Sequence, residues 1–195
     1  MKKMNNKTLP PTQDPQVKYK RIVDSFGDAP FLGALLIAPS CTRGCPGCQN
    51  THLKEEETIL EDAKTVGEAI KINPFWDGII LGGLEPLDDK DNFIPMMEVV
   101  RFSEVHKLFI YTSFEIEDVP FDDIPLSVTK LYVKTGRYLQ NSPTAVVYKL
   151  RNFELELASA NQQLQVYDRD ILGDWKEQRI EIFKEEKNKN ALLET

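Results

Sequence analysis

Residues 31–50 read FLGALLIAPSCTRGCPGCQN and join an apolar run to a loop that contains three cysteines. The apolar run, residues 31–38, has the length of a strand and does not alternate between apolar and polar side chains, which is typical of a strand buried on both faces. Pro39 ends the run, and the loop begins two residues later with Cys41. In parallel α/β sheets, ligands bind beyond the carboxyl ends of the strands. The stretch therefore places a loop of reactive side chains at an edge where ligands collect.

Three more segments along the chain are predicted to be strands. They lie at residues 76–81 (WDGIIL), 108–112 (LFIYT) and 128–134 (VTKLYVK). Helical patterns separate the first three strands of the series, whereas the segment before the fourth strand is poor in helical pattern. Strands that alternate with helices predict a mainly parallel sheet, so the expected fold class is α/β.

Two segments between these strands have the periodicity of helices. In the first, Thr58 and Glu61 have the spacing of a capping box, which predicts that the helix begins at Thr58. Its apolar face would be formed by residues at spacings of three and four, namely Ile59, Ala63, Val66 and Ile70. The second helix is predicted from Phe93, Met97 and Val100, which repeat at the same spacings.

The two ends of the chain differ from this central region. Residues 1–18 are polar and contain three prolines, so we expect a mobile tail before a single domain at residues 19–195. Beyond Ser142 the pattern indicates a short irregular extension. It is expected to contain short strands near residues 145–150, 153–158 and 164–167 and a solvated terminal helix over residues 174–189.

Composition argues against several classes of function. The chain has 195 residues, a net charge of −7 and 41% hydrophobic residues, which is sufficient for one core. The acidic balance argues against non-specific nucleic-acid binding, which needs a basic face. No apolar run approaches the roughly 20 residues of a membrane span, and the N-terminal lysines are not followed by the apolar stretch of a secretory signal. We therefore expect a cytoplasmic protein.

The only cysteines of the chain form the pattern C-x3-C-x2-C at Cys41, Cys45 and Cys48. An odd, closely spaced set is a poor framework for disulfides and is typical of a metal site in a reducing compartment. Gly44 and Gly47 permit backbone angles that side chains disfavour, which helps the loop to wrap around a compact group. Thiolates select zinc or iron–sulfur clusters over hard cations. A four-iron cluster held by three cysteines keeps one iron open for a substrate or cofactor.

Three other interpretations of the loop compete with the cluster. His52 would complete a Cys3His zinc site, which would make the protein a zinc-binding interaction module. A disulfide with one spare thiol is disfavoured by the close spacing, and three inert buried thiols are disfavoured by the glycine and proline content of the loop. The position of the loop after the first strand of a βα series favours the cluster.

Other candidate binding residues are predicted at the same edge because they follow the other strands. These residues are Gly82, Gly83, Glu85, Tyr111, Thr112 and Lys134. The two glycines would let the backbone approach a ligand closely, and the glutamate can accept a hydrogen bond from a cationic amine. The tyrosine and threonine end the third strand, and the lysine ends the fourth.

At these residues the sequence resembles the radical S-adenosylmethionine (SAM) superfamily. The resemblance covers roughly residues 31–140 and depends on the cysteine loop after the first strand and on the Gly-Gly-Leu-Glu turn after the second. Within the superfamily the chain looks most like the activating proteins of anaerobic ribonucleoside-triphosphate reductase. Three segments carry this likeness, namely residues 47–50 (GCQN), 135–138 (TGRY) and 159–164 (SANQQL). The chain departs from the pattern of those activators at Gln49, Leu84 and Gln163.

The resemblance implies a fold and a set of cofactor-binding residues. The implied fold is a partial, open parallel βα barrel of the radical SAM type. Cys41, Cys45 and Cys48 would hold a [4Fe-4S] cluster, and SAM would bind the open iron through its amino and carboxylate groups. The residues that would border SAM are Gly82, Gly83, Glu85, Tyr111, Thr112 and Lys134.

The resemblance also implies a reaction and partners. The reduced cluster would cleave SAM, and the 5′-deoxyadenosyl radical would generate a glycyl radical on the large subunit of anaerobic ribonucleoside-triphosphate reductase. An electron donor such as flavodoxin or ferredoxin would be a second partner, and neither nucleic acid nor a membrane is expected. The alternative is a radical SAM enzyme that acts on a different protein or on a small molecule.

Overall fold

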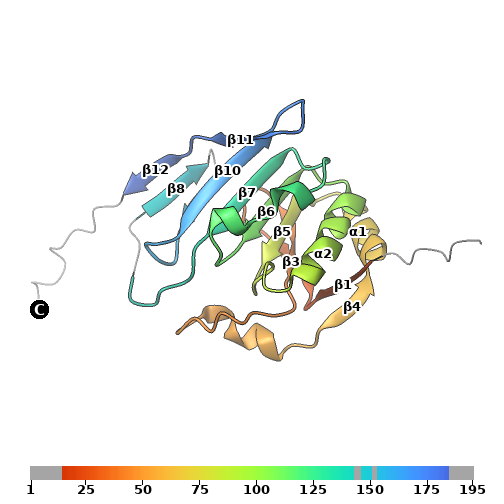
Figure 1. Cartoon of the computed structure of the whole chain (residues 1–195), viewed down its shortest axis with the longest axis horizontal. Helices are drawn as coiled ribbons and strands as arrows, with labels where there is room; N and C mark the ends of the chain where they lie inside the picture. The colour runs from red at the N-terminus through yellow and green to blue at the C-terminus, as the bar shows by residue number, and fades with distance from the viewer. Residues whose placement is uncertain (1–14, 143–145, 151–152, 185–195) are drawn as a thin grey trace, which may run out of the picture.

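The computed structural model describes residues 15–142, 146–150 and 153–184. Its central element is a seven-stranded sheet with the strand order β11-β10-β7-β6-β5-β3-β2 (Figure 1). The four strands β3, β5, β6 and β7 run parallel. Strands β2 and β10 are antiparallel to them, and β11 pairs antiparallel with β10. In chain order the strands are Ile22–Ser25 (β2), Gly33–Ile37 (β3), Gly78–Gly82 (β5), Lys107–Tyr111 (β6), Lys130–Thr135 (β7), Gln163–Arg169 (β10) and Trp175–Gln178 (β11).

The four strands predicted from apolar runs are confirmed as β3, β5, β6 and β7, and so is the mixed α/β class with a mainly parallel centre. Each is almost fully buried because another layer covers each face of the sheet. The sheet is open, with β11 and β2 at its edges, and the described residues show no barrel.

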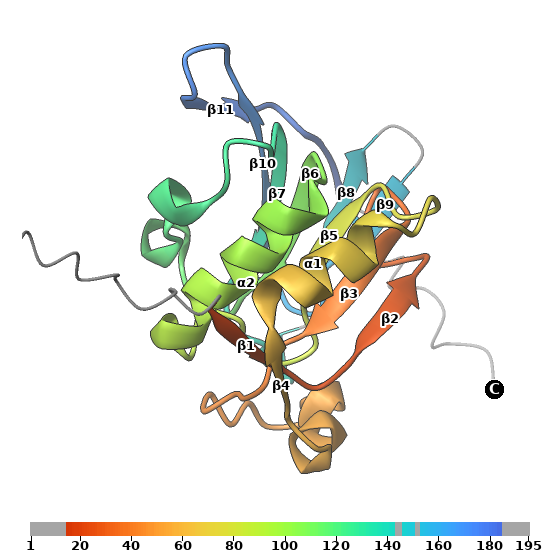
Figure 2. The same cartoon turned by 90° about the vertical axis from the view of Figure 1, so that its right-hand side faces the viewer.

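Two helices cover one face of the sheet, α1 (Ala63–Lys71) and α2 (Lys90–Ser103), which pack against each other (Figure 2). The predicted second helix is confirmed as α2. The connection from β6 to β7 contains only the short 3-10 helices Ile116–Asp118 (η2) and Phe121–Asp123 (η3), as its helix-poor pattern indicates. None of the helices in the described residues is long and apolar enough to cross a membrane.

The predicted start of the first helix is wrong. The segment expected to begin it forms β4 (Ile59–Asp62), which pairs with β1 (Gln16–Tyr19). The hydroxyl of Thr58 accepts a hydrogen bond from Lys20 Nζ at 3.0 Å, so it does not cap a helix. Asp62 caps α1 instead, because its carboxylate accepts from the Thr65 amide at 2.8 Å.

The expected tail at residues 1–18 is also too long. Strand β1 lies within that range, and the side chain of Val17 is fully buried against the core. The other part of the expected tail, residues 1–14, lies outside the described residues. Three of the four residues of β1 therefore lie within the range that was expected to be a tail.

The opposite face of the central sheet is covered by a small antiparallel sheet with the order β12-β8-β9, seen beside β10 in Figure 1. Its strands are Val146–Leu150 (β8), Phe153–Glu156 (β9) and Glu181–Lys184 (β12). The three short strands predicted near residues 145–150, 153–158 and 164–167 are confirmed as β8, β9 and β10. The terminal helix predicted over residues 174–189 is wrong within the described residues, where β11 and β12 form, and residues 185–189 lie outside them. Pairing of β11 with β10 and of β12 with β8 overrides the local helical preference of this polar segment.

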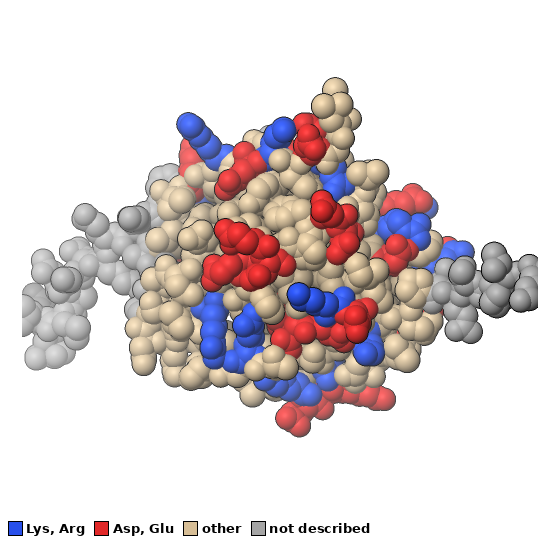
Figure 3. All heavy atoms as spheres, in the orientation of Figure 1, with Lys and Arg blue, Asp and Glu red and all other residues tan. Residues whose placement is uncertain are grey.

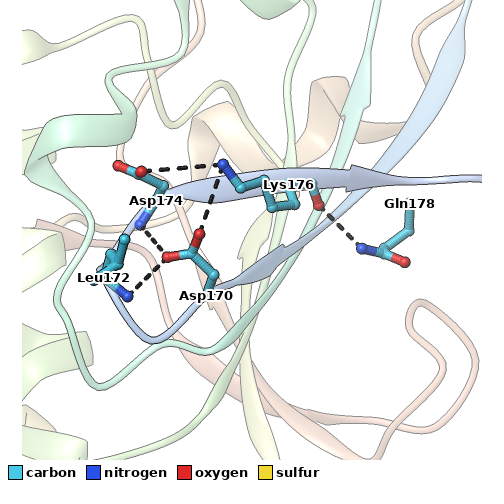
Figure 4. A network of polar contacts seen from close by, with 5 residues as sticks. All are labelled: Asp170, Leu172, Asp174, Lys176 and Gln178. Atoms are coloured by element: carbon cyan, nitrogen blue, oxygen red, sulfur yellow. Dashed lines mark hydrogen bonds and ion pairs between the residues drawn. The ribbon is translucent and has the colours of Figure 1, made fainter.

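A polar network shapes the turn between β10 and β11 (Figure 4). The Asp170 carboxylate accepts from the amides of Leu172 at 2.9 Å and Asp174 at 3.0 Å, and Lys176 Nζ lies 3.6 Å from it. Hydrogen bonds from these backbone amides lower the pKa of Asp170. The turn thereby presents the side chain of Leu172 to solvent.

Charged side chains are mixed on the surface. On the face drawn in Figure 3, acidic and basic groups lie close to one another. Exposed ion pairs such as Lys71–Glu104 connect helix ends across the surface. The net charge of −7 is therefore not gathered into a single acidic field on this face.

Two glycines allow a phenylalanine to lie flat on the central sheet. Gly33 and Gly78 are direct partners on the parallel strands β3 and β5, and the Phe31 ring covers both. A Cβ on Gly78 would lie 2.6 Å from Phe31 Cε2 and 2.5 Å from the Lys107 carbonyl oxygen. These positions therefore require the absence of a side chain rather than a special backbone angle.

We expect Gly78→Ala to lower the free energy of unfolding by about 1–3 kcal/mol, because the new methyl group meets backbone that cannot move aside. Urea denaturation of the purified protein measures this effect. Gly27→Ala is the matched control, since nothing lies within 4 Å of a Cβ there. Equal stability of the two variants would contradict the close packing of Phe31 on the sheet.

Candidate functional site

A cavity of about 600 Å³ lies at the carboxyl ends of the parallel strands. Eight of the nine residues predicted for the site line it: Cys41, Cys45, Cys48, Gly83, Glu85, Tyr111, Thr112 and Lys134. Gly82 does not line it, and its carbonyl oxygen accepts from the amides of Ala38 at 3.1 Å and Leu84 at 2.9 Å. The fold thus brings the ends of β3, β5, β6 and β7 around one space, as expected for ligand sites of parallel sheets.

The cysteine loop is held in place by a carboxylate from the turn after β5. Asp88 accepts from both the amide and the hydroxyl of Thr42, each at 2.7 Å. Gly44 and Gly47 have φ values of +56° and +68°, so the loop uses the backbone freedom predicted for these glycines. All three thiols are half-buried and free, and burial raises the pKa of Cys41.

His52 and the three thiols line the same cavity. Among the described residues, no group of three histidine, cysteine or acidic side chains is gathered around one point. His52 lines the same cavity, within the 3-10 helix Gln49–Glu55 (η1), where its Nδ1 lies 3.0 Å from the Gln49 carbonyl oxygen. A four-iron cluster binds each thiolate to a different iron, so its ligands stand farther apart than those of one zinc ion.

The Glu85 carboxylate connects the ends of β5 and β6. Its Oε1 accepts from the Thr112 hydroxyl at 2.6 Å, and its Oε2 accepts from the amide and hydroxyl of Ser113 at 2.7 and 2.6 Å. A fourth hydrogen bond comes from the Leu87 amide at 3.2 Å. A carboxylate has about four acceptor sites, so the residue is already saturated and positions other groups. Its role as an acceptor for a cationic amine stays a prediction.

Tyr111 and Thr112 differ in their use of polar atoms. The Tyr111 hydroxyl donates to the Asp28 carbonyl oxygen, and its ring stacks on Phe109 with centroids 4.5 Å apart. Burial raises the pKa of this phenol. The Thr112 hydroxyl donates to Glu85 and also accepts from the Phe114 amide at 3.1 Å. Both residues border the cavity, although their hydroxyl groups have protein partners.

Four cationic side chains line the cavity, Arg21, Arg43, Lys54 and Lys134, and of these Arg43 and Lys134 have unusual surroundings. Burial lowers the pKa of Lys134 to about 8, although the nearby Glu85 and Cys45 oppose this shift. The Arg43 guanidinium lies over the Phe114 ring at 3.6 Å, and its buried Nε has no hydrogen-bond partner within the described part of the chain. Lys134 Nζ also donates to the Gly136 carbonyl oxygen at 3.3 Å.

A turn at residues 158–162 holds the loop that follows β7. Gln162 Oε1 accepts from the amides of Ala158 at 3.0 Å and Ser159 at 3.2 Å, while its Nε2 donates to the Gly136 carbonyl oxygen at 3.1 Å. Asn161 Nδ2 donates to the Arg137 carbonyl oxygen at 2.8 Å. We call this set of contacts the Gln162 clamp.

The segment after β7, which the Gln162 clamp holds, contacts the cysteine loop. Arg137 Nη2 donates to the Arg43 carbonyl oxygen at 2.7 Å. The Gln140 side chain lies over Gly47, where a Cβ would come within 2.7 Å of it. The cysteine loop is therefore fixed on one side by Asp88 and on the other by the segment after β7.

Comparisons with the models of known families, with curated proteins and with solved structures found no match for this chain.

Several residues of the site escaped prediction from the sequence. Ser113 directly follows the predicted third strand, so the strand-end rule alone would have found it. Asp88 lies several residues beyond the predicted second strand, so that rule does not reach it. Gln162 lies far along the chain from the loop that it fixes. It belongs to residues 159–164, which resemble a segment of the reductase activators. Its distance from Gly136 along the sequence does not predict that the two residues are in contact.

The lowered pKa of Lys134 predicts a pH-dependent effect of Lys134→Met. In the unfolded chain, Lys134 stays protonated up to its ordinary pKa of 10.5. In the folded state, burial of the protonated ammonium group lowers the free energy of unfolding, and this cost is fully present below about pH 8. That cost falls as the pH rises from about 8 towards 10.5. We expect the substitution to stabilise the protein more at about pH 7 than at about pH 9.5.

Urea denaturation of the protein and of Lys134→Met at both pH values measures this difference. Lys64→Met is the control, because Lys64 is an exposed residue of α1 outside the cavity. A stability difference that does not change with pH would contradict the buried charge.

The Gln162 clamp predicts a loss of stability in Gln162→Met, which removes three hydrogen bonds while keeping side-chain length. The amides of Ala158 and Ser159 would lose their acceptor, and the Gly136 carbonyl would keep only its contact with Lys134 Nζ at 3.3 Å, so we expect a loss of about 1–3 kcal/mol. Hydrogen exchange should accelerate at residues 136–140 and in the cysteine loop. Gln163→Met is the matched control, since that neighbouring side chain is exposed. Similar exchange in both variants would show that the contacts of Gln162 do not hold the loop.

Proposed function

We propose that this protein is a radical SAM enzyme whose fold is a partial barrel of that type. Its reaction would generate a glycyl radical on anaerobic ribonucleoside-triphosphate reductase. The observation that carries the proposal is that one cavity collects all three thiols of the C-x3-C-x2-C loop together with the ends of four parallel strands. The likeness of residues 47–50, 135–138 and 159–164 to reductase activators supports the narrower assignment.

The donor set of the cavity fits a [4Fe-4S] cluster with bound SAM. Three half-buried thiols supply soft ligands for three irons, and no further cysteine exists in the chain to close the fourth. When bound, the cluster supplies the electron that cleaves SAM to a 5′-deoxyadenosyl radical. Gly83 lets the backbone approach the ligand, since its φ of +75° and its contact with Ile37 exclude a side chain there.

The cationic residues of the cavity would bind and orient the carboxylate of SAM. Lys134 and Arg43 both line the cavity, and Arg43 has an unused buried donor. Glu85 fixes the position of Thr112 and Ser113 beside them. The Gln162 clamp and Asp88 would keep the thiol loop in one arrangement as the ligands bind.

An open cavity favours a protein as the substrate. The edge strand β2 contributes Val23 to the lining, so a segment of a partner can reach the cavity from the edge of the sheet. A partner seated there would supply the missing wall and exclude water from a reactive radical. An electron donor such as flavodoxin or ferredoxin would complete the reaction.

Anaerobic reconstitution with iron and sulfide tests the cluster. We expect about four irons per chain, an EPR signal on reduction that changes when SAM is added, and release of 5′-deoxyadenosine. Cys41→Ala, Cys45→Ala and Cys48→Ala should each lose the SAM-dependent change and 5′-deoxyadenosine release. His52→Ala is the control and should keep both. Stoichiometric zinc that depends on His52 would instead establish the Cys3His alternative.

A second measurement tests the substrate. The reconstituted protein, SAM, a reductant and anaerobic ribonucleoside-triphosphate reductase should together give the doublet EPR signal of a glycyl radical. Cleavage of SAM without that doublet would reject the reductase as the substrate and direct the search to another protein or a small molecule.

A further inference from the structure

One buried residue, Lys20, joins the two ends of the segment that carries the cysteine loop. This segment leaves β3 after Ile37 and enters β4 after Thr58. Lys20 lies between β1 and β2, and Figure 2 shows β1 beside β4 at this end of the molecule. The backbone of Lys20 contacts the start of the segment, and its side chain contacts the end.

A bulge connects Lys20 to the start of the segment. The Lys20 amide donates to the Ile37 carbonyl oxygen at 2.9 Å, and the Arg21 carbonyl oxygen accepts from the Ile37 amide at 3.0 Å. Two residues therefore stand opposite one, as in a β-bulge, which locally redirects side chains. The Lys20 side chain is buried, with 7% of the residue exposed, whereas Arg21 is exposed and lines the cysteine cavity.

The ammonium group of Lys20 binds the end of the segment. Its Nζ donates to the Glu56 carbonyl oxygen, to the Thr58 hydroxyl at 3.0 Å and to the Lys54 carbonyl oxygen at 3.3 Å. Lys54 lies in the last turn of η1, where carbonyl groups lack partners within the helix. An ammonium group has three donors, so these three acceptors saturate it.

The charge of Lys20 is buried without a carboxylate beside it. Within the described residues, all the contacts of its Nζ are with carbonyl and hydroxyl oxygens. Burying a cation is costly, and apolar side chains that replace buried charges often leave a protein equally stable. What the ammonium group adds is geometry, because it holds three oxygens of residues 54–58 around one point.

The segment that Lys20 holds forms a wall of the cysteine cavity. Helix η1 begins directly after Cys48, and residues 50–54 line the cavity beside the three thiols. Leu53 is the buried residue of η1, and a Cβ on Gly83 would lie 3.2 Å from its Cδ1. A shift of the end of η1 would therefore displace this wall from both the thiols and the turn after β5.

We infer that Lys20 is a positioning residue of the cysteine cavity, because it fixes the η1 wall relative to the thiols. The identity of the ligand that needs this arrangement, SAM on the cluster, rests on the proposed function. The connection of the two segment ends through Lys20 does not depend on that function.

Hydrogen exchange of the metal-free full chain tests this connection. Lys20→Met keeps the length of the side chain and removes its three donors, so exchange at residues 48–58 should become at least about tenfold faster. Exchange in α2 should stay unchanged. Lys18→Met is the matched control, because Lys18 is an exposed residue of β1. Thr58→Val removes one acceptor and keeps the lysine, and we expect exchange about threefold faster.

Reconstitution with iron and sulfide tests the positioning role. Lys20→Met keeps all three cysteines, so it should still bind about four irons per chain. We expect it to need about tenfold more SAM than the unmodified protein for the same change in the EPR signal. Lys18→Met should respond to SAM as the unmodified protein does. A residue that only stabilised the fold would leave this SAM requirement unchanged.

The outcomes separate this inference from the proposed function. Unchanged exchange at residues 48–58 in Lys20→Met would overturn the inference, and so would faster exchange with an unchanged SAM requirement. Failure of the unmodified protein to take up a cluster would reject the proposed function and, with it, the positioning role towards SAM. Thermal unfolding shows whether each variant is folded, and Thr58→Val provides the test if Lys20→Met does not fold.

Discussion

The buried carboxylate of Glu85 holds together the edge of the sheet on which the site depends. It receives four donors from two strand ends, and its side chain is nearly inaccessible to solvent. An ionised group without such partners would be too costly to bury. The saturated carboxylate thus fixes Thr112 and Ser113 beside the thiol loop. It also explains why the lysine opposite, Lys134, retains part of its basicity in a buried place.

One sheet face carries an aromatic row in which Phe109 stacks with Tyr111 on one side and with Tyr132 on the other. This row and the small sheet β12-β8-β9 belong to one apolar cluster on that face. The strand register alone creates this row, because residues at alternate positions of the same strands point to the same layer.

Continuous apolar runs predicted the four parallel strands because burial on both faces leaves no other pattern. The strand-end rule then predicted eight cavity-lining residues. Local sequence signals failed where contacts between distant segments determine the structure. Lys20 donates to the hydroxyl of Thr58, which was predicted to cap a helix. Pairing of β11 with β10 and of β12 with β8 makes strands of a polar segment that was predicted to be helical. The Gln162 clamp could not be predicted by spacing, because its partners approach only when β10 pairs with β7.

Because the chain is synthesised from its N-terminus, the contact between Arg137 and the Arg43 carbonyl can form only some time after the cysteine loop has been made. Ninety-four residues separate the two, and the turn that supports Arg137 is made later still. At about 5–20 residues per second, a ribosome needs roughly 5–20 s to produce the intervening chain. During that interval the cysteine loop lacks its contact with Arg137. Any inorganic group that reached the nascent chain in this interval would meet a cysteine loop that Asp88 supports and the segment after β7 does not.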